Sequence, residues 1–236
     1  YNKSRNIDDV FIYEIANVYE KHSNDEINHY SEETKVSGLL KGSYLTNGWN
    51  NNIKVDFYLI KGIIENILNF MGLKNRYSFT VCDDIKELHP GMSAKILLDR
   101  QEVGILGRIH PLIDKDDIYV FELSLDRIIR KVKPLKYKQT SKYPDIVKDI
   151  AFIVNKDTPS EEIENIIKKS SSRLLTSIKV FDVYTGDKID KDEKSIAYSL
   201  TFNDPNRTLT EEEVMNIFNK IIIDVEKSSL GRLRDN

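Results

Sequence analysis

Aspartate and tyrosine stand two residues apart in the segment Phe181–Gly186 (FDVYTG). Residues two apart on a β-strand point to the same face, so a strand here would place the Asp182 carboxylate beside the Tyr184 ring. A carboxylate accepts hydrogen bonds, and an aromatic ring offers a flat surface for stacking. The pair therefore suits recognition of a planar ligand. The structural alternative is that Tyr184 closes a sheet and Asp182 caps a turn.

Local signals predict the strands that would carry this pair. Runs rich in β-branched and aromatic residues predict strands at Asp149–Val154, Ile178–Tyr184 and Ser195–Phe202. The polar stretch Thr185–Lys194 predicts a long hairpin loop between the second and third strands. With two helices and a last strand at the end, the order is strand, helix, strand, strand, helix, strand. This order is that of a ferredoxin-like (βαββαβ) domain.

Capping signals predict where the two helices begin. Each start has a threonine followed three positions later by glutamate, the capping-box pattern: Thr158 with Glu161, and Thr210 with Glu213. Pro159 would occupy the first helical position of the first helix. Apolar residues at offsets of three and four continue to Leu174 in the first helix and to Val225 in the second. Gly231 predicts the C-cap of the second helix.

A ferredoxin-like sheet carries its helices on one face, and RNA-recognition modules of this topology stack bases on aromatics of the other face. Topology alone does not assign a function. Six motifs add a specific resemblance: Tyr143–Pro144, Lys148–Phe152, Phe181–Gly186, Lys194–Phe202, Asp204–Val214 and Leu230–Arg234. In order and spacing they resemble the ferredoxin-fold anticodon-binding domain of the bacterial phenylalanyl-tRNA synthetase β-subunit family. One departure is Lys148, where the family usually has arginine, because lysine keeps the charge but loses bidentate geometry.

The first 135 residues extend the resemblance to the inactive, catalytic-like domain of the same subunit. The matching motifs are Gly38–Gly42, Trp49, Val55–Gly62, Leu88–Ala94 and Gly104–Pro111. Without the family, the periodicity predicts a helix at Val55–Met71 and strands at Asp9–Val18, Lys35–Gly42, Tyr77–Cys82, Ala94–Leu98, Glu102–Ile109 and Asp117–Leu123. An antiparallel sheet with helices on one face is the simplest architecture.

We therefore expect an α+β protein with two domains. Residues 1–135 would form the inactive class II synthetase-like antiparallel-sheet domain, and residues 142–236 the ferredoxin-fold anticodon-binding domain. The polar run Lys136–Lys142 would be the linker. Because the chain starts at Tyr1 without methionine, we expect it to be a piece of a longer polypeptide, the C-terminal portion of the β subunit.

The resemblance implies RNA-binding roles for named residues. Tyr184 would stack on an anticodon base. Asp182 would accept hydrogen bonds from N1–H and N2–H₂ of guanine, the base with which phenylalanine anticodons begin. Ser195 would add a hydrogen bond, and Arg232 and Arg234 would pair with phosphates or a base edge.

The resemblance also implies partners and cofactors. The chain would bind phenylalanine tRNA and support an α2β2 holoenzyme with the synthetase α subunit and a second β subunit, but would bind neither DNA nor a membrane. ATP and magnesium would be held by the α subunit, so this fragment would have no cofactor, no metal and no catalytic residue. A single cysteine, Cys82, makes no disulfide framework, which favours a cytoplasmic location.

Charge limits how strongly the chain alone can bind RNA. Residues 142–236 hold 15 basic and 18 acidic side chains, a net charge of −3 that equals the net charge of the whole chain. Binding would depend on local basic residues, namely Lys168, Lys169, Arg173, Lys179, Arg232 and Arg234. We expect weak affinity, because few phosphates can be neutralised. The alternative reading of these charges is a solvated surface.

Other candidate sites fit their chemistry less well. Arg100-Gln101-Glu102 has the arginine-x-glutamate of a class II ATP motif, but it falls in a predicted polar turn. Cys82, His89 and His110 match no compact zinc spacing. Cys82 is interpreted as a buried structural residue. Both histidines precede proline, which predicts turns at these positions.

Two other classes of function stay open. A ferredoxin-like regulatory domain binds a small amino acid at a helix–strand loop that is rich in glycine, whereas the first such loop here is Val154–Thr158. A class II synthetase acting alone would need a glycine-rich run ending in arginine to hold ATP, and the sequence has none.

Overall fold

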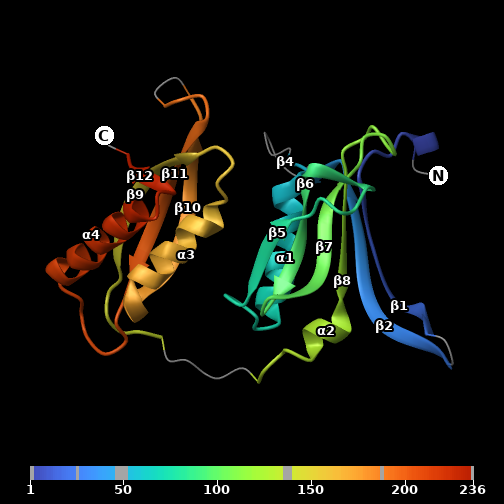
Figure 1. The fold of residues 1–236 in the computed structure, drawn as a ribbon, viewed down its shortest axis with the longest axis horizontal. Helices are drawn as coiled ribbons and strands as arrows, with labels where there is room; N and C mark the ends of the chain where they lie inside the picture. Colours follow the sequence, from blue (N-terminus) through green and yellow to red (C-terminus); the bar gives the residue numbers. More distant parts are fainter. Residues whose placement is uncertain (1–2, 25–26, 46–52, 135–139, 187–188, 235–236) are drawn as a thin grey trace. The chain divides into compact units, whose positions relative to one another are not determined.

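The computed structural model describes residues 3–24, 27–45, 53–134, 140–186 and 189–234 (Figure 1). The chain divides into two compact units, Tyr1–Lys136 and Tyr137–Asn236. Each unit has its own cluster of buried apolar residues. Most of the predicted linker, and Trp49 of the first unit's motifs, lie outside the described residues.

The first unit is built on a six-stranded antiparallel sheet with the order β1-β2-β8-β7-β6-β5. Its strands are β1 (Val10–Asn24), β2 (Ile27–Lys41), β5 (Tyr77–Val81), β6 (Leu88–Leu98), β7 (Gln101–Ile109) and β8 (Ile118–Ser124). Smaller elements are the 3-10 helix η1 (Lys3–Arg5) and the strands β3 (Ser43–Leu45) and β4 (Ile53–Lys54). All six predicted strands are present, and the hairpin of β1 and β2 is much longer than predicted.

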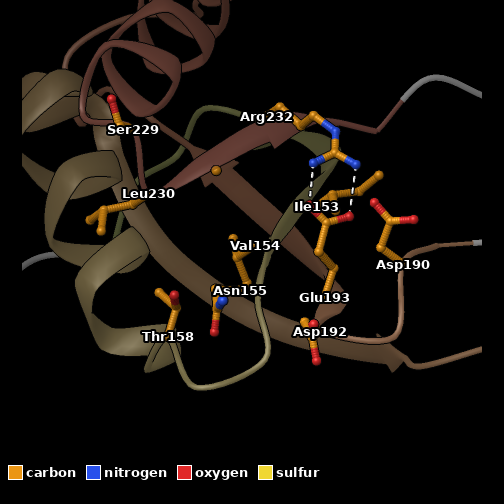
Figure 2. A pocket seen from close by; sticks show the side chains of 11 residues that line it. Ile153, Val154, Asn155, Thr158, Asp190, Asp192, Glu193, Ser229, Leu230 and Arg232 are labelled. Carbon is orange, nitrogen blue, oxygen red and sulfur yellow. Dashed lines mark hydrogen bonds and ion pairs between the residues drawn. The ribbon is translucent and has the colours of Figure 1, made fainter.

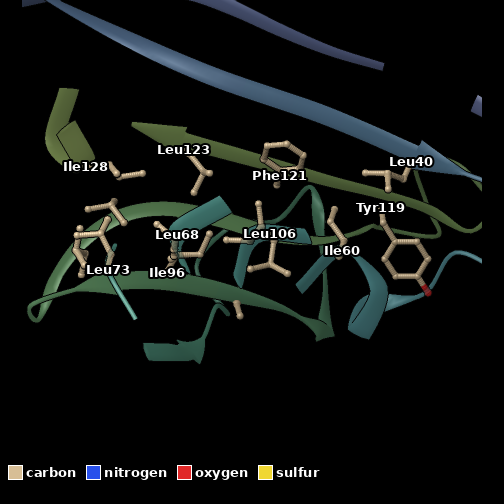
Figure 3. Packing of buried hydrophobic residues seen from close by; sticks show 14 of the residues in the cluster. Leu40, Ile60, Leu68, Leu73, Ile96, Leu106, Tyr119, Phe121, Leu123 and Ile128 are labelled. Atoms are coloured by element: carbon tan, nitrogen blue, oxygen red, sulfur yellow. The ribbon is translucent and has the colours of Figure 1, made fainter. Parts of the chain in front are cut away.

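Helix α1 (Phe57–Phe70) packs on one face of this sheet, as predicted. Asp56 caps it by accepting a hydrogen bond from the Leu59 N–H at 2.7 Å. Ile60, Ile64 and Leu68 recur every fourth residue and are fully buried. Figure 3 shows Ile60 and Leu68 among side chains of β6, β7 and β8. The apolar stripe of α1 therefore forms one half of the core, and the sheet forms the other.

In this unit one short helix was missed and one local prediction was wrong. Helix α2 (Leu125–Ile129), which starts at an N-cap serine that accepts from Arg127 N–H, was not predicted. His89 lies within β6 and not in a turn, because β6 begins at Leu88 and accommodates Pro90 through a register irregularity before Ser93. His110 does lie at a turn, where its Nδ1 accepts from Leu112 N–H at 3.2 Å.

The second unit has the predicted ferredoxin-like order, and the predicted α+β class is confirmed. Its elements are β9 (Ile146–Asn155), α3 (Ser160–Ser170), η2 (Ser172–Leu174), β10 (Leu175–Tyr184), β11 (Glu193–Phe202), α4 (Glu211–Lys227) and β12 (Gly231–Leu233). The antiparallel sheet has the order β10-β11-β9-β12. Helices α3 and α4 pack together on one face of it (Figure 1).

The capping box of α4 is confirmed. The Thr210 hydroxyl accepts from Glu213 N–H at 3.3 Å, and the Glu213 carboxylate accepts from Thr210 N–H at 3.0 Å. The predicted C-cap is wrong, because the helix ends at Lys227 with Ser228 as its C-cap, and the left-handed position is Ser229, with φ of 60°. Gly231 instead opens β12, where an added Cβ would come within 2.9 Å of Val154.

The predicted capping box of α3 is also wrong. Pro159 keeps an extended ψ of 137° and stands outside the helix, which begins at Ser160 without a side-chain cap. The preceding turn is closed by Asn155, whose carbonyl accepts from Thr158 N–H at 3.0 Å. Leu174 lies in η2, beyond the end of α3 at Ser170.

Among the described residues, no helix is both long and apolar enough to cross a membrane.

Candidate nucleic-acid interface

The ferredoxin-like sheet has one face against its helices and one face without them. On β11 the side chains of Ile196, Tyr198 and Leu200 are buried in the cluster that includes α3 and α4. Ser195 and Ala197 alternate with them and therefore point to the other face. Among the described residues of this unit, no helix covers that face, which we call the open face.

A β-bulge at Phe181 decides which residues of β10 reach the open face. Before the bulge, Ile178 and Val180 pack against the core. Strict alternation would continue this pattern and bury Asp182. The pairing with β11 skips Phe181, and beyond it Asp182 lies opposite Ala197. The bulge therefore turns Asp182 and the following alternate residue to the open face.

Tyr184, Ser195 and Arg234 come together on the open face. Tyr184 and Ser195 are cross-strand partners on β10 and β11. Arg234 follows β12 at the other edge of the sheet, where its N–H donates to the Ala151 carbonyl at 3.0 Å. Its Nη1 donates to the Ser195 hydroxyl at 3.3 Å, and its Cζ lies 5.2 Å from the centre of the Tyr184 ring. Three predicted site residues thus form one contact group.

Small side chains form the floor between the two edges of the open face. Ala151 on β9 is paired with Ala197 on β11, and Ala197 is paired with Asp182 on β10. The backbone hydrogen bond from Arg234 to Ala151 places Arg234, the residue after β12, next to these paired residues. Adjacent strands lie about 4.8 Å apart, so a carboxylate and a guanidinium-bearing residue flank a floor of two alanines.

Gly186 leaves room for the Tyr184 ring, a role that the sequence analysis missed. A Cβ added at Gly186 would come within 2.4 Å of the Tyr184 hydroxyl and 2.6 Å of its Cζ. The ring therefore folds over the backbone of Gly186. The signal was present in the motif, since glycine follows tyrosine by two residues.

Arg232 does not join this group. It lies opposite Ile153 on β9, and its guanidinium binds both carboxylate oxygens of Glu193, with Nη2 to Oε2 at 2.8 Å (Figure 2). The hydrogen bond from Arg232 lowers the pKa of Glu193, and the pair raises the pKa of Arg232 in turn. The charge of Arg232 is therefore already neutralised within the protein.

The Arg232–Glu193 pair borders a pocket of about 760 Å³ at the end of the sheet (Figure 2). Asp190 and Asp192 add two further carboxylates to its wall, and among the described residues Arg232 is the one basic residue that lines it. Asn155 and Thr158 also line the pocket. They belong to the loop Val154–Thr158, where a ferredoxin-like regulatory domain would bind its amino acid. This acidic lining does not suit a phosphate.

The predicted basic residues do not form one patch. Lys179 lies opposite Ser199 and shares the open face. Lys168 and Lys169 belong to the last turn of α3, in the layer that covers the other face. Arg173 is exposed in η2.

Lys148, the departure from the family pattern, makes a single-point contact. Its Nζ donates to Glu211 Oε1 at 2.7 Å and lowers the pKa of that carboxyl. Glu211 opens α4, so this pair ties β9 to the start of the helix.

The remaining candidate sites do not assemble. Asp99 and Arg100 form a two-residue hairpin turn with φ of 50° and 68°, which leaves Arg100 exposed. Cys82 is 1% exposed, and burial raises the pKa of its thiol. Within the part of the chain that the structure describes, no three His, Cys, Asp or Glu side chains gather as a metal site.

Comparison with known proteins matches each unit to a described family. Residues 141–234 match the family described as ferredoxin-fold anticodon binding domain, and residues 1–125 match the phenylalanyl tRNA synthetase beta chain CLM domain. The phenylalanine–tRNA ligase beta subunits of Bacillus licheniformis, Carboxydothermus hydrogenoformans and Bacillus subtilis are 36%, 35% and 35% identical to the chain.

These alignments cover 99% of the chain and 30%, 29% and 30% of the respective relatives, so the chain spans about 30% of their length. The predicted resemblance to the C-terminal portion of the β subunit is confirmed, and the regulatory alternative gains no support. Because one family match covers residues 1–125, more than half of the sequence, the chain belongs to the phenylalanyl-tRNA synthetase beta-chain family.

Proposed function

We propose that the second unit binds the anticodon region of phenylalanine tRNA through its open face. The observation that carries this proposal is the contact group of Tyr184, Ser195 and Arg234 on the face that bears Asp182. An aromatic ring, a hydroxyl, a guanidinium and a carboxylate on one uncovered sheet face are the groups with which single-stranded RNA is bound.

Each group has a separate role in this proposal. Tyr184 stacks on the first anticodon base. Asp182 accepts from the N1–H and N2–H₂ donors of guanine, an edge that no other standard base presents. Ser195 is 2% exposed, so its hydroxyl acts at the floor of the face. Arg234 contacts a phosphate or the base edge.

Arg234 is the better candidate of the two C-terminal arginines. Its guanidinium contacts one hydroxyl and one aromatic ring, neither of which neutralises its charge. Arg232, by contrast, donates hydrogen bonds to both carboxylate oxygens of Glu193. A phosphate therefore competes with weak contacts at Arg234 and with a bidentate ion pair at Arg232.

We further propose that residues 1–135 form an inactive class II synthetase-like domain and residues 142–236 the anticodon-binding domain. The relatives are named as beta subunits, which supports partnership with an α subunit and a second β subunit in an α2β2 holoenzyme in the cytoplasm. ATP and magnesium then act in the α subunit. The exposed Arg100 turn supports a chain without its own nucleotide chemistry.

Comparative binding tests the proposal. Fluorescent phenylalanine tRNA should bind the 236-residue chain at low salt more tightly than a tRNA whose anticodon lacks guanine at the first position. Tyr184→Ala should weaken binding, whereas the control Tyr58→Ala, 77% exposed in the first unit, should not. Equal affinity for both tRNAs, unchanged by Tyr184→Ala, would overturn the proposed site. Phenylalanine-dependent pyrophosphate exchange by the chain alone would overturn the noncatalytic assignment.

A further inference from the structure

Two arginines of the C-terminal segment cross the same strand in the same direction. Arg232 lies opposite Ile153 of β9 and reaches over that strand to Glu193 of β11. Arg234 bonds to Ala151 of β9 and reaches over it to Ser195 of β11. The two arginines are two residues apart in the chain, and their partners Glu193 and Ser195 are two residues apart on β11. The crossings are therefore parallel, and they differ in strength, because one ends on a carboxylate and the other on a hydroxyl.

The segment that carries these arginines is also held by the hydrogen bond from Leu233 N–H to the Glu226 carboxylate at 3.4 Å. β12 is three residues long and lies at the edge of the sheet, paired to β9. Leu233 packs against the core, and Gly231 fits closely against Val154. On the open face, the bidentate Arg232–Glu193 pair is a charged contact that ties β12 across β9 to β11. It precedes Arg234 by two residues.

From this geometry we propose that Glu193 and Arg232 act as positioning residues that hold Arg234 over Tyr184. They set the end of β12 without touching the RNA. This inference rests on the proposed function, because Arg234 matters only if the open face binds tRNA. It also reassigns Arg232, which the sequence reading placed among the RNA contacts.

The role of Glu193 can be tested by asking whether Glu193→Gln strengthens or weakens tRNA binding. Glu193→Gln removes a negative charge from a domain with net charge −3, so electrostatics alone predicts tighter RNA binding. It would also release Arg232 for a phosphate. The positioning role predicts the opposite: the last residues lose a restraint, and ordering them on binding weakens affinity by about threefold to tenfold.

The experiment uses the 236-residue chain and fluorescent phenylalanine tRNA at several salt concentrations. Glu193→Gln and Arg232→Gln should each weaken binding, and the charge swap Glu193→Arg with Arg232→Glu should restore it. In an Arg234→Ala background neither single change should have a further effect. The slope of log affinity against log salt should stay the same for Arg232→Gln, whereas a lost phosphate contact would reduce it by about 0.7.

Hydrogen exchange supplies a readout without RNA. The amide of Arg234, which donates to Ala151, should exchange faster in Glu193→Gln, whereas amides of α4 should keep their protection. Tighter binding by Glu193→Gln, or an additive loss in the Arg234→Ala background, would overturn the positioning role. If tRNA binds and Tyr184→Ala weakens it while Glu193→Gln changes nothing, this inference fails and the proposed function stands. If Tyr184→Ala also has no effect, the proposed function fails with it.

Discussion

Arg234 and Tyr184 lie at opposite edges of one four-stranded sheet, yet the guanidinium carbon of the first is 5.2 Å from the ring centre of the second. The contact spans β9 and β11: Arg234 lies beside Ala151 of β9, and its guanidinium also donates to Ser195 of β11, the cross-strand partner of Tyr184. A cation over an aromatic face is worth about 0.5–1 kcal/mol at an exposed site. A nucleobase is a larger partner for the Tyr184 ring than a guanidinium. The ring surface that contacts Arg234 can therefore also stack on a base.

Replacing Tyr184 with alanine should weaken tRNA binding by about 1–3 kcal/mol, the usual worth of a base–aromatic stack. Tyr184→Phe keeps the ring and should bind nearly as well as the original chain. Binding titrations with phenylalanine tRNA measure both. A loss of equal size in Tyr184→Phe would show that the hydroxyl, and not the stack, supplies the affinity.

Asp182→Asn should show a penalty that depends on the base. An amide keeps one acceptor oxygen but presents a donor to the donors of guanine, so binding should weaken for a guanine at the first anticodon position. The penalty should shrink when that base is replaced. Titration of the two tRNAs against both chains gives the comparison. Equal weakening for both, with an unchanged circular dichroism spectrum, would mean that Asp182 supports structure and does not read sequence.

The order of elements and the shared face of Asp182 and Tyr184 could be predicted from sequence, because both depend on local periodicity. Which face they share could not. Ile178 and Val180 alternate with Asp182, and the bulge at Phe181 that breaks this alternation depends on pairing with β11. Likewise, nothing local distinguishes Arg232 from Arg234. Their different roles arise because β12 places Arg232 within reach of Glu193, 39 residues away in the chain.

Gly186→Ala should disturb the site without unfolding the unit. The added methyl would meet the Tyr184 hydroxyl end of the ring at 2.4 Å, so the ring must move away from its present position over the backbone. We expect weaker tRNA binding together with a melting temperature close to that of the original chain. Gly62→Ala, where an added Cβ meets nothing within 4 Å, is the matched control. Unchanged affinity in Gly186→Ala would show that the ring position is not set by this glycine.

The stability of the second unit should depend on pH through Glu213. The hydrogen bond from Arg207, followed by the one from Thr210 N–H, lowers the Glu213 pKa from its ordinary 4.5 to about 2. A lowered pKa in the folded state stabilises the fold above pH 4.5, and this contribution disappears as the pH falls from 4.5 towards 2.

Arg207→Gln removes the main cause of that shift, so it should lower the melting temperature at pH 7 and have little effect near pH 2. Thermal denaturation of both chains across this range measures the difference, and other carboxyl groups cancel because they titrate in both. A difference that stays constant with pH would show that Arg207 stabilises the unit by packing and not through Glu213.

Truncation of Ile64 should destabilise the first unit. Ile64 is fully buried in the centre of the α1 stripe, and Ile64→Ala should cost about 2–5 kcal/mol in the free energy of unfolding. The exposed Tyr58 of the same helix gives the control, since Tyr58→Ala should change it by less than about 0.5 kcal/mol. Urea denaturation monitored by hydrogen exchange should place the loss in the first unit. An equal loss of protection in β9 and β11 would contradict the division into two separately stabilised units.

Limited proteolysis tests the boundary between those units. Lys136, Lys138 and Lys142 offer trypsin three sites at or near the boundary between the two compact units along the chain. Lys220 and Lys227 lie in α4, whose capping box and buried Val214, Ile221 and Val225 hold the helix against the sheet. Cleavage requires several extended residues, which a packed helix supplies only by opening. The first products seen by mass spectrometry should therefore end between Lys136 and Lys142. A first cut within α4 would contradict both the proposed boundary and the stability assigned to that helix.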